Sequence, residues 1–294
     1  MDERKDYLVE NLRDPVWYTE NMWKYGLSKF PPAIVTCAIT GANGGKELNA
    51  ALPESIEEQV ESAYEAYRAG AAMIHIHTRN PDNLAQMSFD PELYECVNAK
   101  IREKCPDVII NNTCICGRQI DVDSRSLSPQ MLSIPKAGAE VGSVDVSCYF
   151  SQIPMKPRLP DHPEPWLKDN GYCISKSDVD TALETLKQYG IKAEFECFAM
   201  TDLQYVRSLV NRGWTDPMGG PNWIHFVYTN GSNWNLPEFM STLKLTVPNN
   251  SMLGIIATGA QQWPVLAMAL VHGFNIRVGM EDNVYIEKGV KASS

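Results

Sequence analysis

The 294-residue sequence contains no uninterrupted run of about 18 apolar residues, the length that a membrane-spanning helix needs. Its N-terminus, MDERKDYLVENLRDP, has no apolar segment of the kind found in secretory signals. Basic residues are scarce for a general nucleic-acid-binding protein, because 26 Lys and Arg stand against 36 Asp and Glu. We therefore expect a cytoplasmic protein without a membrane or nucleic-acid partner. The overall negative charge does not exclude an anionic small molecule as ligand, because a local basic pocket can bind one.

The eight cysteines do not by themselves indicate disulfides. Cys37, Cys114, Cys116, Cys148 and Cys197 lie in or beside apolar strand-like runs, which predicts buried free thiols in a reducing compartment. Cys114 and Cys116 also form a C-x-C pair, so a metal site stays open as an alternative to core packing.

Short apolar runs alternate with segments of helical period along most of the chain. We predict strands at 33–39, 72–77, 107–114, 141–148, 192–198, 222–228, 251–257 and 274–280. Of the amphipathic segments between them, 55–71 starts with a capping box (Ser55, Glu58) and 177–191 has a helix stop at Gly190. Eight strands alternating with helices predict an α/β fold, a (β/α)₈ TIM barrel over residues 33–294. A doubly wound sheet is the alternative, but no G-x-G-x-x-G follows the first strand.

Two segments do not fit this alternation. Residues 1–32 are rich in aromatic residues and predict an N-terminal extension that packs over the barrel or a neighbouring subunit. Residues 150–173 contain too many prolines for a helix and predict a long loop after the fourth strand. Long loops in this position often build the rim of an active site, so we expect the same here.

The second predicted strand, in AAMIHIHTRN (71–80), places two histidines in an otherwise apolar run. Side chains alternate along a strand, so His75 and His77 point to the same face. At the C-terminal end of a barrel strand this face lines the mouth, where two imidazoles form half of a metal site. Two core histidines satisfied by hydrogen bonds are the alternative.

The eighth predicted strand ends in IRVGMEDN (276–283), which adds Arg277, Glu281 and Asp282. Strands eight and two both neighbour strand one in a closed barrel, so a carboxylate of one can meet the histidines of the other. His75, His77 and Glu281 would then form a metal site with an open position for substrate. A solvated acidic turn is the alternative.

The fifth predicted strand, KAEFECF (192–198), carries two glutamates on one face. If Phe195 and Cys197 face the helices, Glu194 and Glu196 point into the barrel. A buried carboxylate needs an arginine, a metal or a proton as its partner. Glu196 lies nearer the mouth and is the better candidate for active-site chemistry, while structural pairing stays open.

The motifs CAITGA, IHIHTRN, EFECF and RVGMEDN, in this order and spacing, resemble those of the β-keto acid cleavage enzymes from about residue 33 to 294. The resemblance implies a (β/α)₈ barrel, usually a homo-oligomer (dimer or tetramer), that binds Zn²⁺ or another divalent metal. It also implies a retro-Claisen acyl transfer, in which a β-keto acid condenses with acetyl-CoA, its co-substrate, to give acetoacetate and a new acyl-CoA.

The resemblance further implies roles for individual residues. It gives the metal ligands as His75, His77 and Glu281, the dyad that removes the substrate's α-proton as Arg277 and Asp282, and an active-site glutamate as Glu196. Thr113 matches a hydroxyl residue after the third strand, and we expect it to bind substrate together with Asn112 and Asn43. The chemistry agrees, because a β-keto acid can chelate zinc through its ketone and carboxylate oxygens, and the metal then stabilises the enolate.

Three positions depart from the family pattern. Asn80 and Ala199 stand where many members carry acidic residues. Asn43 lies near the position where members with aminated substrates carry a carboxylate, which argues against a primary-amine substrate. A neutral polar substrate fits, and so does a quaternary ammonium compound in an aromatic cage; three tryptophans could form this cage or belong to the core or an interface, namely Trp223, Trp234 and Trp263.

Two other functions stay open. A zinc hydrolase on the same fold would recruit four histidines and often a lysine, but His162, His225 and His272 are poorly placed for it. The second is a non-catalytic barrel that binds a small molecule. The candidate metal ligands and the candidate dyad are all present, which argues against this interpretation.

Overall fold

The computed structural model describes residues 32–42, 44–115, 118–119, 131–147, 149–157, 163–229, 239–240, 242–243, 246–248 and 250–294. Residues 1–31 of the predicted N-terminal extension lie outside this part of the chain. Within it, every helix is too short or too polar to cross a membrane.

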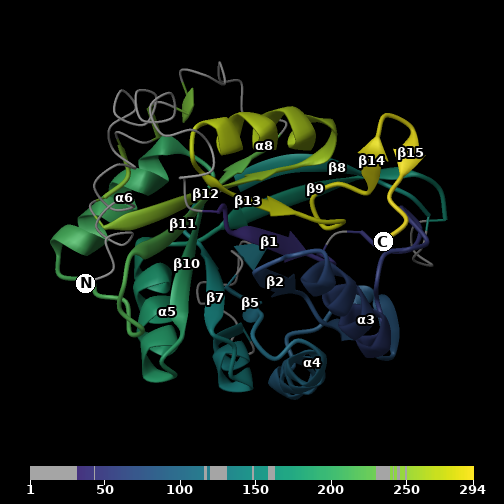
Figure 1. Cartoon of the computed structure of the whole chain (residues 1–294), viewed down its shortest axis with the longest axis horizontal. Coiled ribbons are helices and arrows are strands. Elements are labelled where there is room, and N and C mark those ends of the chain that lie inside the picture. Colours follow the sequence, from purple (N-terminus) through teal and green to yellow (C-terminus); the bar gives the residue numbers. More distant parts are fainter. Residues whose placement is uncertain are drawn as a thin grey trace.

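Eight parallel strands close into a barrel (Figure 1), which confirms the predicted fold and makes the doubly wound alternative wrong. The barrel strands are β1 (Val35–Ala38), β2 (Met73–Ile76), β5 (Ile109–Ile115), β7 (Val141–Asp145), β10 (Lys192–Cys197), β11 (Asn222–Tyr228), β12 (Ser251–Ala257) and β13 (Asn275–Val278). Around the barrel the order is β1-β13-β12-β11-β10-β7-β5-β2, so β13 and β2 both pair with β1. The two segments with the candidate metal ligands are therefore separated by one strand.

Helices lie outside the barrel (Figure 1). They are α3 (Ile56–Arg68), α4 (Pro91–Lys104), α5 (Lys176–Gln188), α6 (Met200–Asn211) and α8 (Gln262–Val271), with 3₁₀ helices η2 (Met131–Ala137) and η3 (Gly259–Gln261). The capping box of α3 is confirmed: the N–H of Glu58 donates to Ser55 Oγ at 3.2 Å, and the N–H of Ser55 donates to Glu58 Oε2 at 3.1 Å. The stop after α5 is confirmed as well, because Gly190 has a φ of 68°, which favours glycine.

The main core lies between the barrel and the helices, and it fixes which strand residues face inward. Phe195 and Cys197 are buried in this core, so Glu194 and Glu196 face the barrel interior, as predicted. Ile110 and Cys114 of β5 belong to the same core. This alternation determines which polar side chains of the barrel strands face the interior.

The structure describes the side chains of five cysteines, and each is a thiol rather than half of a disulfide: Cys37, Cys96, Cys105, Cys114 and Cys197. Cys114 is buried in the core, which favours packing over a metal site at the C-x-C pair. Cys116 and Cys148 lie outside the described residues.

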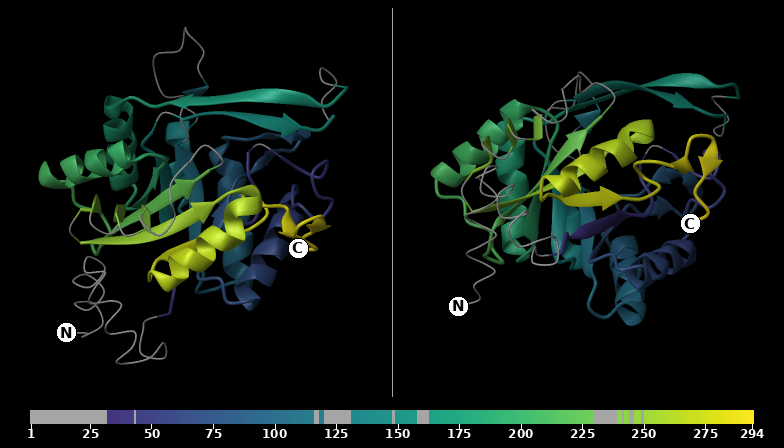
Figure 2. Two further views of the ribbon diagram at one scale, coloured as in Figure 1. Left: turned by 90° about the horizontal axis from the view of Figure 1, so that it is seen from above. Right: turned by 45° about the horizontal axis from the view of Figure 1, so that its top comes forward.

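The segment after β7 is a β-hairpin, so the predicted irregular loop is wrong. β8 (Tyr149–Met155) pairs antiparallel with β9 (Trp166–Cys173), and β6 (Arg118–Gln119) pairs with the other side of β9. Figure 2 shows this long hairpin extending along one side of the molecule. Proline excludes a helix here, but it is tolerated on an edge strand such as β8, where Pro154 lies opposite Leu167.

Candidate active site

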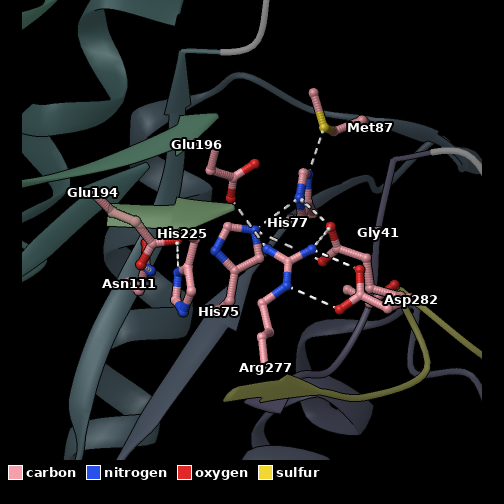
Figure 3. Close-up of polar contacts among 12 residues, drawn as sticks. Gly41, His75, His77, Met87, Asn111, Glu194, Glu196, His225, Arg277 and Asp282 are labelled. Atoms are coloured by element: carbon pink, nitrogen blue, oxygen red, sulfur yellow. Dashed lines mark hydrogen bonds and ion pairs between the residues drawn. The ribbon is translucent and has the colours of Figure 1, made fainter. Parts of the chain in front are cut away.

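Three side chains from two parts of the chain converge at the C-terminal ends of the barrel strands: His75 and His77 (Figure 3), and Glu281. His75 Nε2 lies 3.1 Å from His77 Nε2 and 3.7 Å from Glu281 Oε2, and His77 Nε2 lies 3.4 Å from Glu281 Oε1. Both histidines are buried, and the side chain of Glu281 is only 15% exposed. Among the described residues, this is the one group of three or more His, Cys, Asp or Glu side chains placed so that they could hold a metal ion.

The pairing of neighbouring strands explains this convergence. His75 lies in register with Ala38 of β1, and the N–H of Glu281 donates to the carbonyl oxygen of the same Ala38 at 3.2 Å. Ile76 packs into the core between barrel and helices, so His75 and His77 on either side of it face the interior. The meeting of these groups, predicted from the closed barrel, is present in the structure.

Arg277 is buried on β13 and contacts three carboxylates, of which those of Glu196 and Asp282 are labelled in Figure 3. Its Nε and Nη2 donate to Asp282 Oδ2 and Oδ1 at 2.9 and 2.7 Å, a bidentate pair. Nη2 also donates to Glu281 Oε1 at 3.0 Å, and Nη1 donates to Glu196 Oε1 at 3.2 Å. One guanidinium thus connects the candidate metal ligand, the candidate base and the glutamate of β10.

Three carboxylates around one guanidinium leave surplus negative charge in a buried site. Burial raises the pKa of Asp282, and it raises the pKa of Glu196 well above the ordinary value, although Arg277 opposes both shifts. Burial also acts to raise the pKa of Glu281, but Arg277 and the two histidines outweigh it, so this pKa is lowered. Burial lowers the pKa of His75 to about 3. A neutral imidazole and an ionised carboxylate are the forms that bind metal ions.

The residues at this point fit a divalent cation. With bonds of about 2.0–2.1 Å, the ligand atoms of a tetrahedral zinc ion lie ~3.4 Å apart. The separations of 3.1, 3.4 and 3.7 Å between His75, His77 and Glu281 lie close to that value. Glu281 Oε2 is buried and has no hydrogen-bond partner within the described residues, which leaves it free to accept a cation. Two positive charges would also offset the surplus of carboxylates.

The loop after β1 packs directly against Glu281. A Cβ on Gly41 would lie 2.6 Å from Glu281 Cγ, so an alanine there would displace the carboxylate. Arg79 Nη2 donates to the carbonyl oxygens of Gly41 and Gly44, and to Thr40 Oγ1. The arginine of the H-x-H-x-R motif therefore supports this loop, a role that the motif alone did not reveal.

A second polar cluster fills the barrel interior around Glu194. Its Oε2 accepts hydrogen bonds from Asn111 Nδ2 and Trp223 Nε1, both at 2.7 Å, and its Oε1 lies 3.0 Å from His225 Nδ1. All four side chains are buried, so Glu194 has the structural pairing that the sequence left open. His225 is engaged with Glu194 and does not join His75 and His77. Sequence reasoning missed the pairing of Glu194 with His225, although the two residues lie on the adjacent strands β10 and β11, at positions that face the barrel interior.

Asp145 of β7 is a further residue that sequence reasoning missed. It lies in register with Glu196. Burial is the main cause of the raised pKa of Glu196, and the negative charge of Asp145 raises this pKa further. Its position as the last residue of β7 was the available signal.

The three predicted substrate-binding residues have different positions. Thr113 of β5 lies in register with Ser143 of β7, which in turn lies in register with Glu194 of β10. Since Glu194 faces the barrel interior, Thr113 faces it as well. Asn112 lies in register with Ile76, on the face that packs against the helices, so the barrel does not bring it toward the histidines. Asn43 lies outside the described residues.

The suggested tryptophan cage is wrong for the two members that the structure describes. Trp223 is buried in the interior and bonded to Glu194, whereas Trp263 lies on the outer helix α8 with 46% of its surface exposed. Trp234 lies outside the described residues.

Known proteins resemble this chain along most of its length. The family model described as "beta-keto acid cleavage enzyme" matches residues 32–294. The 3-keto-5-aminohexanoate cleavage enzymes of Acetoanaerobium sticklandii and Fusobacterium nucleatum are 32% and 33% identical over 266 and 280 residues, and both alignments cover 89% of this chain and 86% of the relative. The 3-dehydrocarnitine:acetyl-CoA trimethylamine transferase of Rhizobium meliloti is 26% identical, with 91% and 88% covered.

Solved structures show a related fold. The binary complex of ObcA with oxaloacetate has a TM-score of 0.60 and 17% sequence identity to this chain. The alignment covers 83% of this chain and 61% of the ObcA chain, so the chain spans about three fifths of that protein. At this identity the likeness concerns the fold alone.

Proposed function

The chain belongs to the β-keto acid cleavage enzyme family, and from this premise we propose that it condenses a β-keto acid with acetyl-CoA to give acetoacetate and a new acyl-CoA. The observation that carries the proposal is the convergence of His75, His77 and Glu281 beside the Arg277–Asp282 pair. The name of one relative, the 3-oxoadipate:acetyl-CoA acetyltransferase of Cupriavidus necator, supports acetyl-CoA as the co-substrate. The partners are then two small molecules, and we expect a homo-oligomer from the family resemblance.

His75, His77 and Glu281 hold the cation in this proposal. Zinc is the first choice, because two imidazoles and one carboxylate are a common ligand set that leaves one position open. When bound, the metal acts as a Lewis acid that stabilises negative charge on the oxygens of the keto acid, an effect of several kcal/mol. Thr113 and Asn43 are assigned to the substrate side of the same site.

Asp282 is the base that removes the α-proton. Arg277 holds both of its oxygens, at 2.7 and 2.9 Å, and so fixes the direction of the carboxylate. The raised pKa of Asp282 makes it a stronger base than a solvent-exposed aspartate, while the guanidinium stabilises its ionised form. Glu196 lies on another side of Arg277 and, in the protonated form that its raised pKa favours, can donate a hydrogen bond to substrate.

The proposed reaction consists of proton transfer, acyl transfer and cleavage of a carbon–carbon bond, so it needs no redox cofactor. Loss of the α-proton leaves a carbanion that attacks the acetyl thioester and releases CoA as a thiolate. The thiolate attacks the original ketone, and the bond between this carbon and the α-carbon breaks. The proton on Asp282 returns to the α-carbon to complete acetoacetate, and the remaining acyl group leaves as its CoA thioester.

A panel of substrates tests the proposed reaction. We expect the zinc-loaded protein to release acetoacetate from acetyl-CoA and at least one β-keto acid, among acids with plain acyl, amino and trimethylammonium side chains. Acetoacetate is measured by a coupled assay and the acyl-CoA by mass spectrometry. Turnover of amides or lactones without CoA would instead support a zinc hydrolase. Metal binding without turnover of any keto acid would support the non-catalytic barrel.

Gly41→Ala tests the packing beside Glu281. The new Cβ would displace Glu281 from the two histidines, so we expect roughly tenfold weaker zinc binding, as for changes in residues that support metal ligands. Zinc affinity is measured by competition with a chelator. Gly44→Ala is the control in the same loop, because a Cβ there would also clash, but with the end of the Leu48 side chain and not with Glu281. Equal losses in both variants would contradict a specific effect on Glu281.

A further inference from the structure

The second nitrogen of His77 faces a sulfur atom. Met87 Sδ lies 3.0 Å from His77 Nδ1 (Figure 3). In most metal sites this nitrogen donates to a carboxylate, a backbone carbonyl or water, and a thioether is a weaker acceptor than any of these. The corresponding nitrogen of His75 has no hydrogen-bond partner within the described residues. The two candidate ligands therefore differ, and Met87 supports only one of them.

A short hairpin holds Met87 in this position. β3 (Arg79–Asn80) pairs with β4 (Asn83–Met87), and Arg79 lies in register with Met87. The N–H of Ser88 donates to the carbonyl oxygen of Thr78 at 2.9 Å, and Thr78 Oγ1 donates to the carbonyl oxygen of Ser88 at 3.3 Å. Since Thr78 and Ser88 directly follow His77 and Met87, their pairing keeps the imidazole and the sulfur side by side.

The proton of His77 has two competing positions. Glu281 Oε1 lies 3.4 Å from Nε2, and a carboxylate there favours the tautomer with its proton on Nε2. That tautomer cannot bind a cation through Nε2, because the lone pair is occupied. An acceptor at Nδ1 favours the opposite tautomer, in which Nε2 is free.

We propose that Met87 is a positioning residue for the metal site: its sulfur accepts the Nδ1–H of His77 and so directs the Nε2 lone pair toward the cation. This inference rests on the proposed role of His77 as a metal ligand. A thioether also makes the imidazole a weaker electron donor than a carboxylate would, which leaves the metal a stronger Lewis acid. An oxygen acceptor in place of the sulfur should therefore tighten metal binding.

Two variants of similar size separate the hydrogen bond from packing. Met87→Leu removes the acceptor and keeps the apolar volume, so we expect about tenfold weaker zinc binding in the full-length protein, the low end of the range for residues behind a metal ligand. Met87→Gln supplies an amide oxygen, and we expect zinc binding at least as tight as in the unaltered protein. Met218→Leu is the matched control, because Met218 is 55% exposed. Chelator competition at fixed pH gives all four affinities.

The outcomes distinguish this inference from the metal site itself. We expect the Tm of zinc-free Met87→Leu to match that of the unaltered protein, with a smaller rise when zinc is added. Unchanged zinc affinity in Met87→Leu overturns the role of Met87 and leaves the metal site standing. Equal weakening by Leu and Gln points to packing and also overturns it. If the unaltered protein binds no zinc, the metal site fails and this inference fails with it.

Discussion

Glu281→Ala is expected to lose zinc binding and turnover together. The change removes one of the three proposed ligands and leaves His75 and His77 without the carboxylate whose Oε1 lies 3.4 Å from His77 Nε2. We expect zinc affinity to fall by more than about 100-fold, beyond the range seen for residues that only support ligands. Arg277 keeps Asp282 and Glu196 as partners, so the fold should persist. Metal content and acetoacetate release are measured on the same preparation.

Glu287→Ala is the control for this variant, because Glu287 is an exposed glutamate on the nearby hairpin of β14 (Tyr285–Glu287) and β15 (Val290–Lys291). It should bind zinc and turn over normally. If Glu281→Ala bound zinc as the unaltered protein does, the assignment of the ligands would be wrong.

Asp282→Asn is expected to keep the metal and lose catalysis. The amide has nearly the shape of the carboxylate but cannot accept the α-proton, and none of the three proposed metal ligands is changed. Removal of a general base typically costs about 10²–10⁴-fold in rate, and we expect a decrease in kcat of this size. A direct measurement is the exchange of the substrate's α-proton with deuterated water, followed by NMR without acetyl-CoA, so that only the first step is observed.

Asp180→Asn is the control, because the Asp180 side chain is 48% exposed and has no part in the proposed reaction. Exchange at the normal rate in Asp282→Asn would contradict its role as the base. Glu196, which contacts the same guanidinium, would then be the next residue to test.

Most of the fold could be predicted because its signals are local. The runs at 222–228 and 251–257 match β11 and β12 residue for residue, and Ser55 and Gly190 mark helix boundaries through short-range hydrogen bonds and backbone conformation. The segment 150–173 was misjudged for a physical reason. Proline excludes a helix, yet whether a strand tolerates it depends on whether the strand lies at a sheet edge, and this is a property of the assembled sheet.

Part of the candidate site could be predicted in the same way. His75 and His77 share a face because side chains alternate along a strand, and the closed barrel then implies a meeting with Glu281. Asn112 shows the limit of motif matching. It neighbours Thr113 in the sequence, but alternation turns it to the helix side of β5.

The amino-acid sequence by itself determined the eight-strand alternation and the inward faces of β2 and β10, because strand periodicity is set by the backbone over a few residues. Only the tertiary structure decided that Arg277 contacts three carboxylates, that Gly41 packs on Glu281 and that a thioether lies at His77 Nδ1. These contacts join segments far apart in the chain or depend on the path of a turn. They follow from strand order, register and side-chain packing, which local periodicity does not specify.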